Sequence, residues 1–304
     1  MNLTKEIQQN LPSEAKKTVS SLLATLKAKN KNAVLVGGVV RDLILGVPVT
    51  DVDFMLEHPA VEVVKEVARL LNAKIIEHDS FLTFTIHLPS GHHFDFVTAR
   101  EETYSSPAKL PKVKPSSFER DLKRRDFSIN AIAAWLNPEK FGETFDPFLG
   151  MADIRNKQIR VLHQNSFNDD PTRIYRAARF AARLDFQVEP ATLSFIRDSV
   201  AKSIPKLLTP ARLRHELEKI LVDRKPLQTL RLLSDWDALK FLGEHWRILP
   251  EHELAVPPNP VEGRELLVRR LGEWLKPWGK YSAQKALQDL GFERAVKNEV
   301  LKIF

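Results

Sequence analysis

Two acidic residues, Asp51 and Asp53, stand two positions apart in the run Asp-Val-Asp-Phe-Met-Leu of residues 51–56. The alternation of polar and apolar residues predicts a β-strand that carries both carboxylates on one face. Because like charges so close together repel, a cation between them is expected, and hard oxygen ligands select Mg²⁺ or Mn²⁺. Asp95 supplies a third carboxylate from another predicted strand. Divalent ions held in this way serve in-line displacement at phosphorus, although an Asp-x-Asp pair alone also occurs on solvated strand edges.

A pair of glycines precedes the two aspartates. Residues 33–36 predict a short apolar strand that runs into Gly37 and Gly38, and residues 39–45 predict a helix that contains Arg41. Backbone N–H groups at such a turn approach phosphates closely, and the helix dipole favours the negative charge. The dinucleotide and Walker patterns are both absent. A tight strand-to-helix turn without a ligand is the alternative, and the aspartates downstream favour the phosphate-binding interpretation.

Composition narrows the class of protein. With 304 residues and a hydrophobic fraction of 43%, the chain is expected to fold into two or more packed units. The net charge of +7 favours a polyanionic partner. The absence of cysteine leaves carboxylates and histidines as the possible metal ligands. No apolar run is long enough to span a bilayer and the first residues lack a signal-peptide pattern, so a cytoplasmic location without membrane contact is expected.

Hydrophobic periodicity divides the chain into two halves. The first half predicts a mixed α/β unit, with helices over 12–29, 39–45 and 61–71 and strands over 33–36, 51–56, 74–76, 83–86 and 93–97. Residues 103–117 carry three prolines and three lysines without periodicity, which predicts an exposed, mobile loop. An apolar helix is predicted over 128–135. Beyond Pro171 the pattern is all-helical, with helices over 173–184, 190–200, 210–222, 226–233 and 265–274.

Five ordered motifs resemble those of the class II, bacterial-type family of CCA-adding tRNA nucleotidyltransferases and poly(A) polymerases. They are Val-Leu-Val-Gly-Gly-Val-Val-Arg-Asp (34–42), Asp-Val-Asp (51–53), Arg-Arg-Asp-Phe-Ser-Ile-Asn-Ala (124–131), Asp-Pro-Phe-Leu-Gly (146–150) and Asp-Asp-Pro-Thr-Arg-Ile-Tyr-Arg-Ala-Ala-Arg-Phe (169–180). The resemblance covers about residues 33–221. It implies an α/β polymerase-beta-like nucleotidyltransferase head over 31–145 after an N-terminal helix over 1–30. A helical neck over 146–205 and a helical body with a short, RNA-binding tail over 206–304 are expected to follow.

The resemblance also implies roles for individual residues in the first half. Asp51 and Asp53 are the expected metal ligands, and Asp95 looks like the third carboxylate, which accepts a proton from the RNA 3′-hydroxyl or supports the metal. Gly38, Arg41 and Arg125 are the expected contacts to the incoming nucleotide. Asn130 is expected to support the turn after Arg125 through hydrogen bonds to the backbone, and residues 146–150 are expected to be a hinge.

The last motif combines two possible roles. Asp170 and Arg173 lie three residues apart at a predicted helix start, a spacing that fits a helix cap with an intrahelical ion pair. The resemblance implies instead that both side chains select the base of CTP or ATP. Arg176 and Arg179 follow at three-residue steps and are expected to lie apart from the buried stripe, free for the triphosphate or the base.

Several departures from the family pattern leave the activity open. This chain has Asp169 where the family often has Glu, and Ala211-Arg212-Leu213 where it often has Glu-Arg-Ile; its tail is short. Addition of CCA to tRNA from CTP and ATP is the leading interpretation, followed by CC-only or A-only addition and then by poly(A) synthesis. A catalytically dead RNA-binding module is disfavoured because all three aspartates are present. A sugar-phosphate nucleotidyltransferase is disfavoured by the helical, basic second half. His78 and the pair His92-His93 lack further ligands and are not expected to bind metal.

Overall fold

The computed structural model describes residues 1–247, 254 and 263–304. The chain divides into two compact units. The first comprises Met1–Ser105, Leu110–Asn156 and Arg160–Leu162, and the second comprises Ser106–Lys109, Lys157–Ile159 and His163–Phe304. This two-part division does not resolve the four regions expected from the sequence, which remain a prediction. None of the helices in the described ranges is long and apolar enough to cross a membrane.

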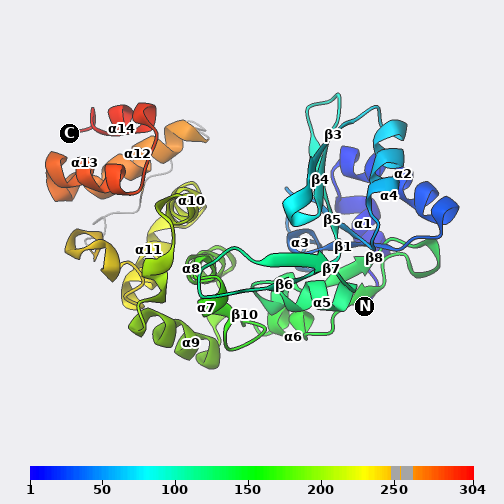
Figure 1. Ribbon diagram of the computed structural model, residues 1–304, viewed down its shortest axis with the longest axis horizontal. Coiled ribbons are helices and arrows are strands. Elements are labelled where there is room, and N and C mark those ends of the chain that lie inside the picture. The colour runs from blue at the N-terminus through cyan, green and yellow to red at the C-terminus, as the bar shows by residue number, and fades with distance from the viewer. Residues whose placement is uncertain (248–253, 255–262) are drawn as a thin grey trace. The chain divides into compact units, whose positions relative to one another are not determined.

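The first unit is built on a seven-stranded sheet with the order β3-β4-β5-β2-β1-β8-β9. The strands are β1 (Ala33–Val36), β2 (Asp53–Leu56), β3 (Lys74–His78), β4 (Thr83–His87), β5 (His93–Thr98), β8 (Ala133–Trp135) and β9 (Thr144–Phe145). Neighbouring strands are antiparallel except β2 and β5, which run parallel. All five strands predicted in the first half are present, so the mixed α/β prediction is confirmed (Figure 1).

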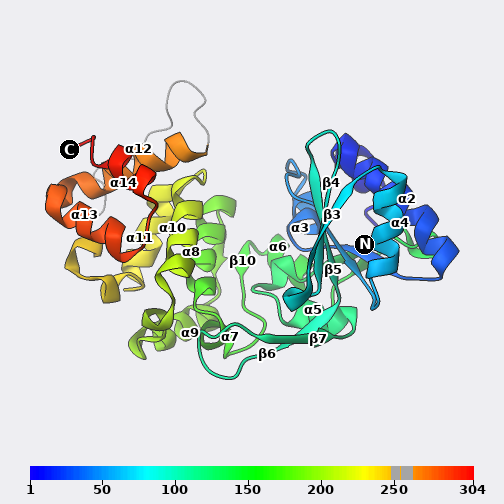
Figure 2. The ribbon, with the colours of Figure 1, turned by 45° about the horizontal axis from the view of Figure 1, so that its top comes forward.

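Helices accompany this sheet. They are α1 (Thr4–Asn10), α2 (Ser13–Lys29), α3 (Gly38–Leu45), α4 (Val61–Leu70), α5 (Phe118–Lys123) and α6 (Gly150–Arg155), with 3₁₀ turns η1 (Asp79–Phe81), η2 (Ser128–Asn130) and η3 (Pro138–Lys140). Figures 1 and 2 both show α2 and α4 side by side along the sheet. The sequence of α4 places Val63, Val64 and Val67 on one buried stripe, which explains why this helix packs rather than remaining in solvent.

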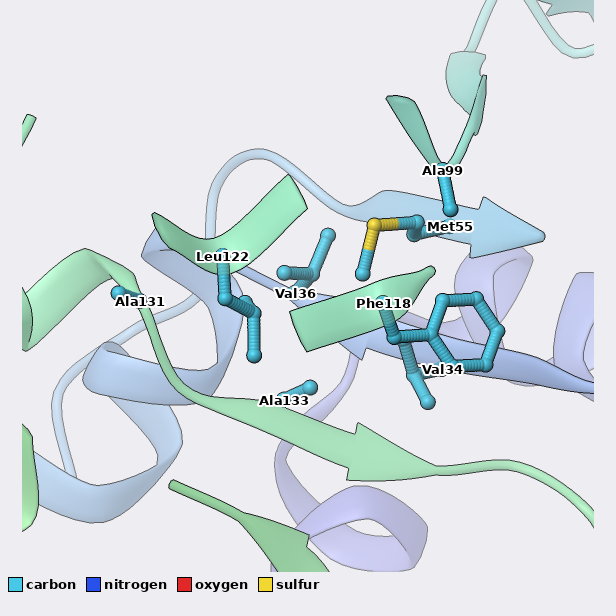
Figure 3. Packing of buried hydrophobic residues seen from close by; sticks show 8 residues of the cluster. All are labelled: Val34, Val36, Met55, Ala99, Phe118, Leu122, Ala131 and Ala133. Atoms are coloured by element: carbon cyan, nitrogen blue, oxygen red, sulfur yellow. The ribbon is translucent and has the colours of Figure 1, made fainter. Parts of the chain in front are cut away.

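Helix α5 covers one part of a sheet face. Figure 3 shows Phe118 and Leu122 of α5 against Val34 and Val36 of β1 and Met55 of β2. Ser117 caps the N-terminus of the helix: its hydroxyl accepts a hydrogen bond from the backbone N–H of Arg120 at 3.3 Å. The cluster fixes the position of α5 and therefore of the residues that follow it.

Two predicted elements differ in the structure. The strand expected over 51–56 begins at Asp53, so Asp51 precedes it and lies exposed. The apolar helix expected over 128–135 is wrong: η2 is followed by β8, which pairs with β1 in the middle of the sheet. A strand buried on both faces is a continuous apolar run, and such a run has no period that separates it from a buried helix.

The loop expected over residues 103–117 is also partly wrong. β6 (Arg100–Thr103) and β7 (Lys112–Pro115) form an antiparallel two-stranded ribbon in the first unit. Pro115 stands at the end of its strand, where a missing N–H is tolerated. Residues 106–109, between the two strands, belong to the second unit.

The second unit is mostly helical, as predicted. Its helices are α7 (Ser166–Asp169), α8 (Thr172–Leu184), α9 (Pro190–Ala201), α10 (Pro210–Leu221), α11 (Pro226–Asp235), α12 (Arg264–Leu275), α13 (Gly279–Asp289) and α14 (Arg294–Val300), with 3₁₀ turns η4 (Ile204–Leu207), η5 (Lys240–Leu242), η6 (Glu244–Arg247) and η7 (Lys276–Trp278). One strand pair, β10 (Gln158–Ile159) with β11 (Gln187–Val188), interrupts the helical pattern. The five helices predicted beyond Pro171 are all present.

Candidate active site

The glycine turn after β1 brings backbone close to two charged side chains. Gly37 has a φ of 84°, which L side chains rarely adopt. A Cβ atom on Gly37 would lie 2.9 Å from Nη1 of Arg125 and 3.7 Å from Oδ2 of Asp53. The turn therefore requires glycine for its conformation, and a side chain at this position would also displace the guanidinium of Arg125. Gly38 begins α3, one residue before the helix predicted over 39–45, and its contact with a nucleotide remains a prediction.

Parallel pairing of β2 with β5 brings two predicted carboxylates together. Asp53 and Asp95 are directly opposite in the register, although 42 positions separate them in the sequence. Burial raises the pKa of Asp53 to about 6; the guanidinium of Arg125 opposes this shift, and the carboxylates of Asp95 and Asp51 add to it. Asp51 thus lies near enough to act on Asp53 electrostatically from outside the strand. Asp95 is oriented by Thr85, whose hydroxyl donates to its Oδ1 at 2.7 Å.

These carboxylates line a cavity of about 340 Å³ within the first unit. Its walls are formed by Asp53, His78, Thr83, Thr85, Asp95, Val97, Arg124 and Arg125. Within residues 1–247, 254 and 263–304, no group of three or more His, Asp or Glu side chains is gathered closely enough to hold a metal ion. Asp53 and Asp95 therefore form a pair, with Asp51 near it. Anionic oxygen donors and a raised carboxyl pKa fit a hard divalent cation, which relieves the repulsion between them.

A buried aspartate that sequence analysis missed holds the arginine side of the cavity. The side chain of Asp121 in α5 is 0% exposed; its Oδ2 accepts from Arg124 at 2.7 Å and its Oδ1 from Nη2 of Arg125 at 3.1 Å. It also accepts from the backbone N–H of Arg100 at 3.2 Å. Arg124 donates further to Glu102 at 2.8 Å. Arg124 and Arg125 follow Asp121 by three and four residues at the end of α5, and this spacing is the signal in the sequence that could have identified Asp121 as their partner.

Replacing Asp121 with Asn is expected to lower the free energy of unfolding by about 1–3 kcal/mol, because buried donors lose a charged acceptor. Urea unfolding, followed by far-ultraviolet circular dichroism, measures the change. Glu66→Gln is the matched control, since Glu66 forms an exposed pair with Arg69 on α4 and its loss is expected to leave the midpoint nearly unchanged. Equal midpoints for the two variants would contradict a structural role for Asp121.

Arg41 lies inside the protein next to the glycine turn. Only 4% of it is exposed, and its guanidinium donates to Oδ1 of Asn130 at 2.6 Å and to Asp42 at 2.8 Å. Asn130 in turn donates to Asp126 at 3.1 Å. The side chain of Asn130 was expected to support the turn after Arg125 through hydrogen bonds to the backbone. It instead bonds the side chains of Arg41 and Asp126. The contact of Arg41 with a nucleotide remains a prediction.

In the second unit, Asp170 stands between α7 and α8 and is held by two partners. Its Oδ1 accepts from the backbone N–H and the hydroxyl of Thr172, at 3.0 and 2.5 Å. The same oxygen accepts from Nη2 of Arg212 in α10 at 2.7 Å. Arg212 also donates through Nη1 to the carbonyl of Ala108 at 2.7 Å. The sequence shows Arg212 only as part of a departure from the family pattern, because a partner 42 residues away leaves no local signal.

The arginines of α8 are less free than expected. Arg173 is only 5% exposed and donates to the hydroxyl of Ser166 at 2.7 Å. Arg179 is also buried and donates to Asp223 at 3.4 Å, and Arg183 donates to the same carboxylate at 2.7 Å. The expectation that Arg179 lies apart from the buried stripe is thus wrong, because its side chain is buried and forms an ion pair with Asp223. Arg176 is half-buried. Nucleotide contacts by Asp170 and by these arginines remain predictions.

Two family models match parts of this chain. The family model described as "Poly A polymerase head domain" matches residues 33–160, and the model described as "Probable RNA and SrmB- binding site of polymerase A" matches residues 185–249. The first region contains the glycine turn, the carboxylates and the arginines of the cavity. The second begins just after α8.

Individual relatives are similar over most of this chain. The A-adding tRNA nucleotidyltransferase of Aquifex aeolicus is 42% identical over 213 residues, which are 70% of this chain and 26% of that protein. The solved structure titled "The structure of CCA-adding enzyme apo form II" has a TM-score of 0.80 and 33% identity, over 99% of this chain and 73% of that one. The Thermotoga maritima CCA-adding enzyme complexed with tRNA has a TM-score of 0.78 and 31% identity, over 99% and 72%. The chain spans only about a quarter to a half of the first curated relatives it matches.

Proposed function

Because the chain belongs to the family of poly(A) polymerase head-domain proteins and CCA-adding tRNA nucleotidyltransferases, we propose that it adds C and A nucleotides to the 3′ end of tRNA. The reaction uses CTP and ATP and needs no nucleic-acid template. The observation that carries the proposal is the meeting of Asp53, Asp95 and Arg125 in one cavity, with Asp53 and Arg125 next to the glycine turn. We also propose a cytoplasmic location, where these substrates are found.

In the proposed reaction the RNA 3′-hydroxyl attacks the α-phosphate of the nucleotide and pyrophosphate leaves. The bond from the 3′-oxygen to phosphorus forms while the bond to the pyrophosphate oxygen breaks, so no covalent enzyme intermediate is needed. Backbone N–H groups from Gly38 onward, at the start of α3, would face the phosphates, whereas the N–H of Gly37 donates to the carbonyl of Ile132. Arg125 would add positive charge. Asp95, oriented by Thr85, accepts the proton of the 3′-hydroxyl or supports the metal.

Asp51 and Asp53 would hold Mg²⁺ or Mn²⁺. When bound, such an ion neutralises negative charge that develops on the reacting oxygens. The register supports this assignment, because Asp53 stands opposite Asp95. Burial first, and then the nearby carboxylates of Asp95 and Asp51, raise the pKa of Asp53, and a bound cation would favour its charged form.

For base selection, we propose Asp170 and Arg173, with Arg176 and Arg179 on the same helix. The hydrogen bond from Arg212 fixes the carboxylate of Asp170, and Ser166 fixes the guanidinium of Arg173. A pair held in this way presents a fixed arrangement of acceptor and donor to a base edge, which a fluctuating pair does not.

One assay tests the function directly. Three tRNA substrates, ending before the first C, before the second C and before the final A, are each incubated with one NTP and Mg²⁺, and product lengths are read. CCA addition predicts extension of the first two substrates by CTP and of the third by ATP. The name of the Aquifex aeolicus relative favours a second candidate, addition of A alone, in which only the third substrate is extended. Extension of no substrate would contradict both.

Replacing Arg212 with Met is expected to reduce discrimination against UTP and GTP by about three- to tenfold, because Asp170 loses its charged partner and keeps only Thr172, while a long side chain remains at position 212. The ratio of kcat/KM values for the four NTPs measures the effect. Arg214→Met on the same helix is the control, since Arg214 donates to the carbonyls of Leu290 and Gly291 instead. An unchanged ratio in Arg212→Met would show that Asp170 does not depend on it.

A further inference from the structure

The face of the sheet that carries the carboxylates continues beyond Asp95 onto two more strands. In the register of β5, β4 and β3, Asp95 is opposite Thr85, and Thr85 is opposite Ile76. In the neighbouring row, Val97 is opposite Thr83, and Thr83 is opposite His78. Directly opposed residues point to the same face of a sheet. Ile76, His78, Thr83 and Thr85 therefore share a face with Asp53 and Asp95, and we name these four residues the β3–β4 platform.

The β3–β4 platform lies open where the rest of this face is covered. The cluster of α5 covers Met55 on β2, which stands in the same row as Val97. Ile76, in contrast, is 47% exposed, and His78 is exposed as well. His78, Thr83 and Thr85 line the same cavity as the carboxylates. Ile76 leaves about half of its surface exposed in the same row as Thr85 and Asp95, so its apolar side chain is available to a ligand in that row.

The stereochemistry of the proposed reaction indicates from which strands of this face the RNA 3′-hydroxyl approaches. In-line displacement places the attacking oxygen and the leaving pyrophosphate on opposite sides of phosphorus. In the proposed reaction the phosphates of the nucleotide bind at the glycine turn, which follows β1. From β1 the sheet order runs through β2 with Asp53 and β5 with Asp95 to β4 and β3. If pyrophosphate leaves toward the glycine turn, the 3′-hydroxyl must arrive from the β4 and β3 side.

We propose that the β3–β4 platform binds the 3′-terminal nucleotide of the RNA; this inference rests on the proposed nucleotidyl transfer. Ile76 offers an apolar surface to the base or the ribose. The imidazole of His78 stacks on a base or donates to a phosphate, and the hydroxyl of Thr83 pairs with either. Thr85 contributes through Asp95, to which its hydroxyl already donates.

Kinetics of a double variant, Ile76→Thr with His78→Ala, tests the inference. The KM for tRNA is expected to rise about tenfold, whereas the KM for NTP at saturating tRNA stays within about twofold, because the triphosphate side is untouched. Glu77→Gln is the matched control: Glu77 lies between the two replaced residues on the other face of β3, 4.0 Å from Lys65 of α4. An active double variant with both KM values unchanged would overturn the inference.

A second measurement uses the wild-type chain and does not depend on turnover. RNA whose last nucleotide is 4-thiouridine is irradiated with the protein in the absence of NTP, and the attached peptide is identified by mass spectrometry. A crosslink within residues 74–87 is expected. Crosslinks confined to other segments would overturn the inference even with normal activity. A wild-type chain that extends no tRNA would instead contradict the proposed function, so the two failures are distinguishable.

Discussion

Replacing Asp53 with Asn is expected to reduce addition of every nucleotide by about a thousandfold or more, and Asp51→Ala is expected to have a similar effect. These side chains would hold the metal ion that neutralises charge developing in the transition state, so most of the loss is expected in kcat. Single-turnover rates with saturating CTP or ATP and Mg²⁺ measure it. Asparagine preserves the size of Asp53, which excludes a simple packing defect as the cause.

Binding of tRNA by both variants is expected to stay within about threefold, because phosphate contacts depend on basic side chains elsewhere. Glu62→Gln is a control for loss of a carboxylate, since Glu62 is exposed on α4. Turnover of either variant within about tenfold of wild type would remove that residue from the metal assignment.

Arg173→Ala is expected to lower discrimination against UTP and GTP by about ten- to a hundredfold. A buried polar group that pairs with the correct base is left unpaired by the wrong one, and that penalty is about 1–3 kcal/mol. Arg173 is buried and oriented by Ser166, so its position is set before a nucleotide arrives. Values of kcat/KM for all four NTPs on one tRNA give the ratio, and a melting curve gives the stability.

The alternative role for Arg173 is structural, and it predicts a different result. In that case the melting temperature falls while the NTP ratios stay at wild-type values. Arg197→Ala is the matched control, because Arg197 is exposed on α9 in the same unit. Arg173→Lys separates charge from shape, since lysine lacks the planar fork of arginine and is expected to lose selectivity too.

Local signals in the sequence account for much of the first unit. The apolar run of β1 ends at Gly37, which has a positive φ. A glycine directly after an apolar strand predicts such a conformation, because glycine adopts positive φ without steric cost. Alternation of polar and apolar residues identified β5, with Asp95 on its outer face. These features depend on residues next to each other, so a single sequence suffices to predict them.

Features that depend on residues far apart in the chain could not be predicted from the sequence. β8 is apolar throughout because it is buried on both faces of the sheet, and no period in residues 133–135 reveals this. The pairing of Arg212 with Asp170 joins residues of different helices. The spacing within α8 predicts that Arg179 lies apart from the buried stripe. It cannot predict the ion pair with Asp223, which lies far beyond this helix in the sequence.

The sheet order also has a consequence for how the first unit forms during synthesis. β1 lies between β2 and β8, so Val34 pairs with both Met55 and Trp135. Until residue 135 has left the ribosome, one edge of β1 has no partner, and its sequence Ala-Val-Leu-Val is wholly apolar. Pairings of such long sequence separation are slow to form. The nascent chain therefore carries an unpaired apolar edge for most of the unit's synthesis, which makes residues 33–36 the segment of this sheet most exposed to aggregation at that stage.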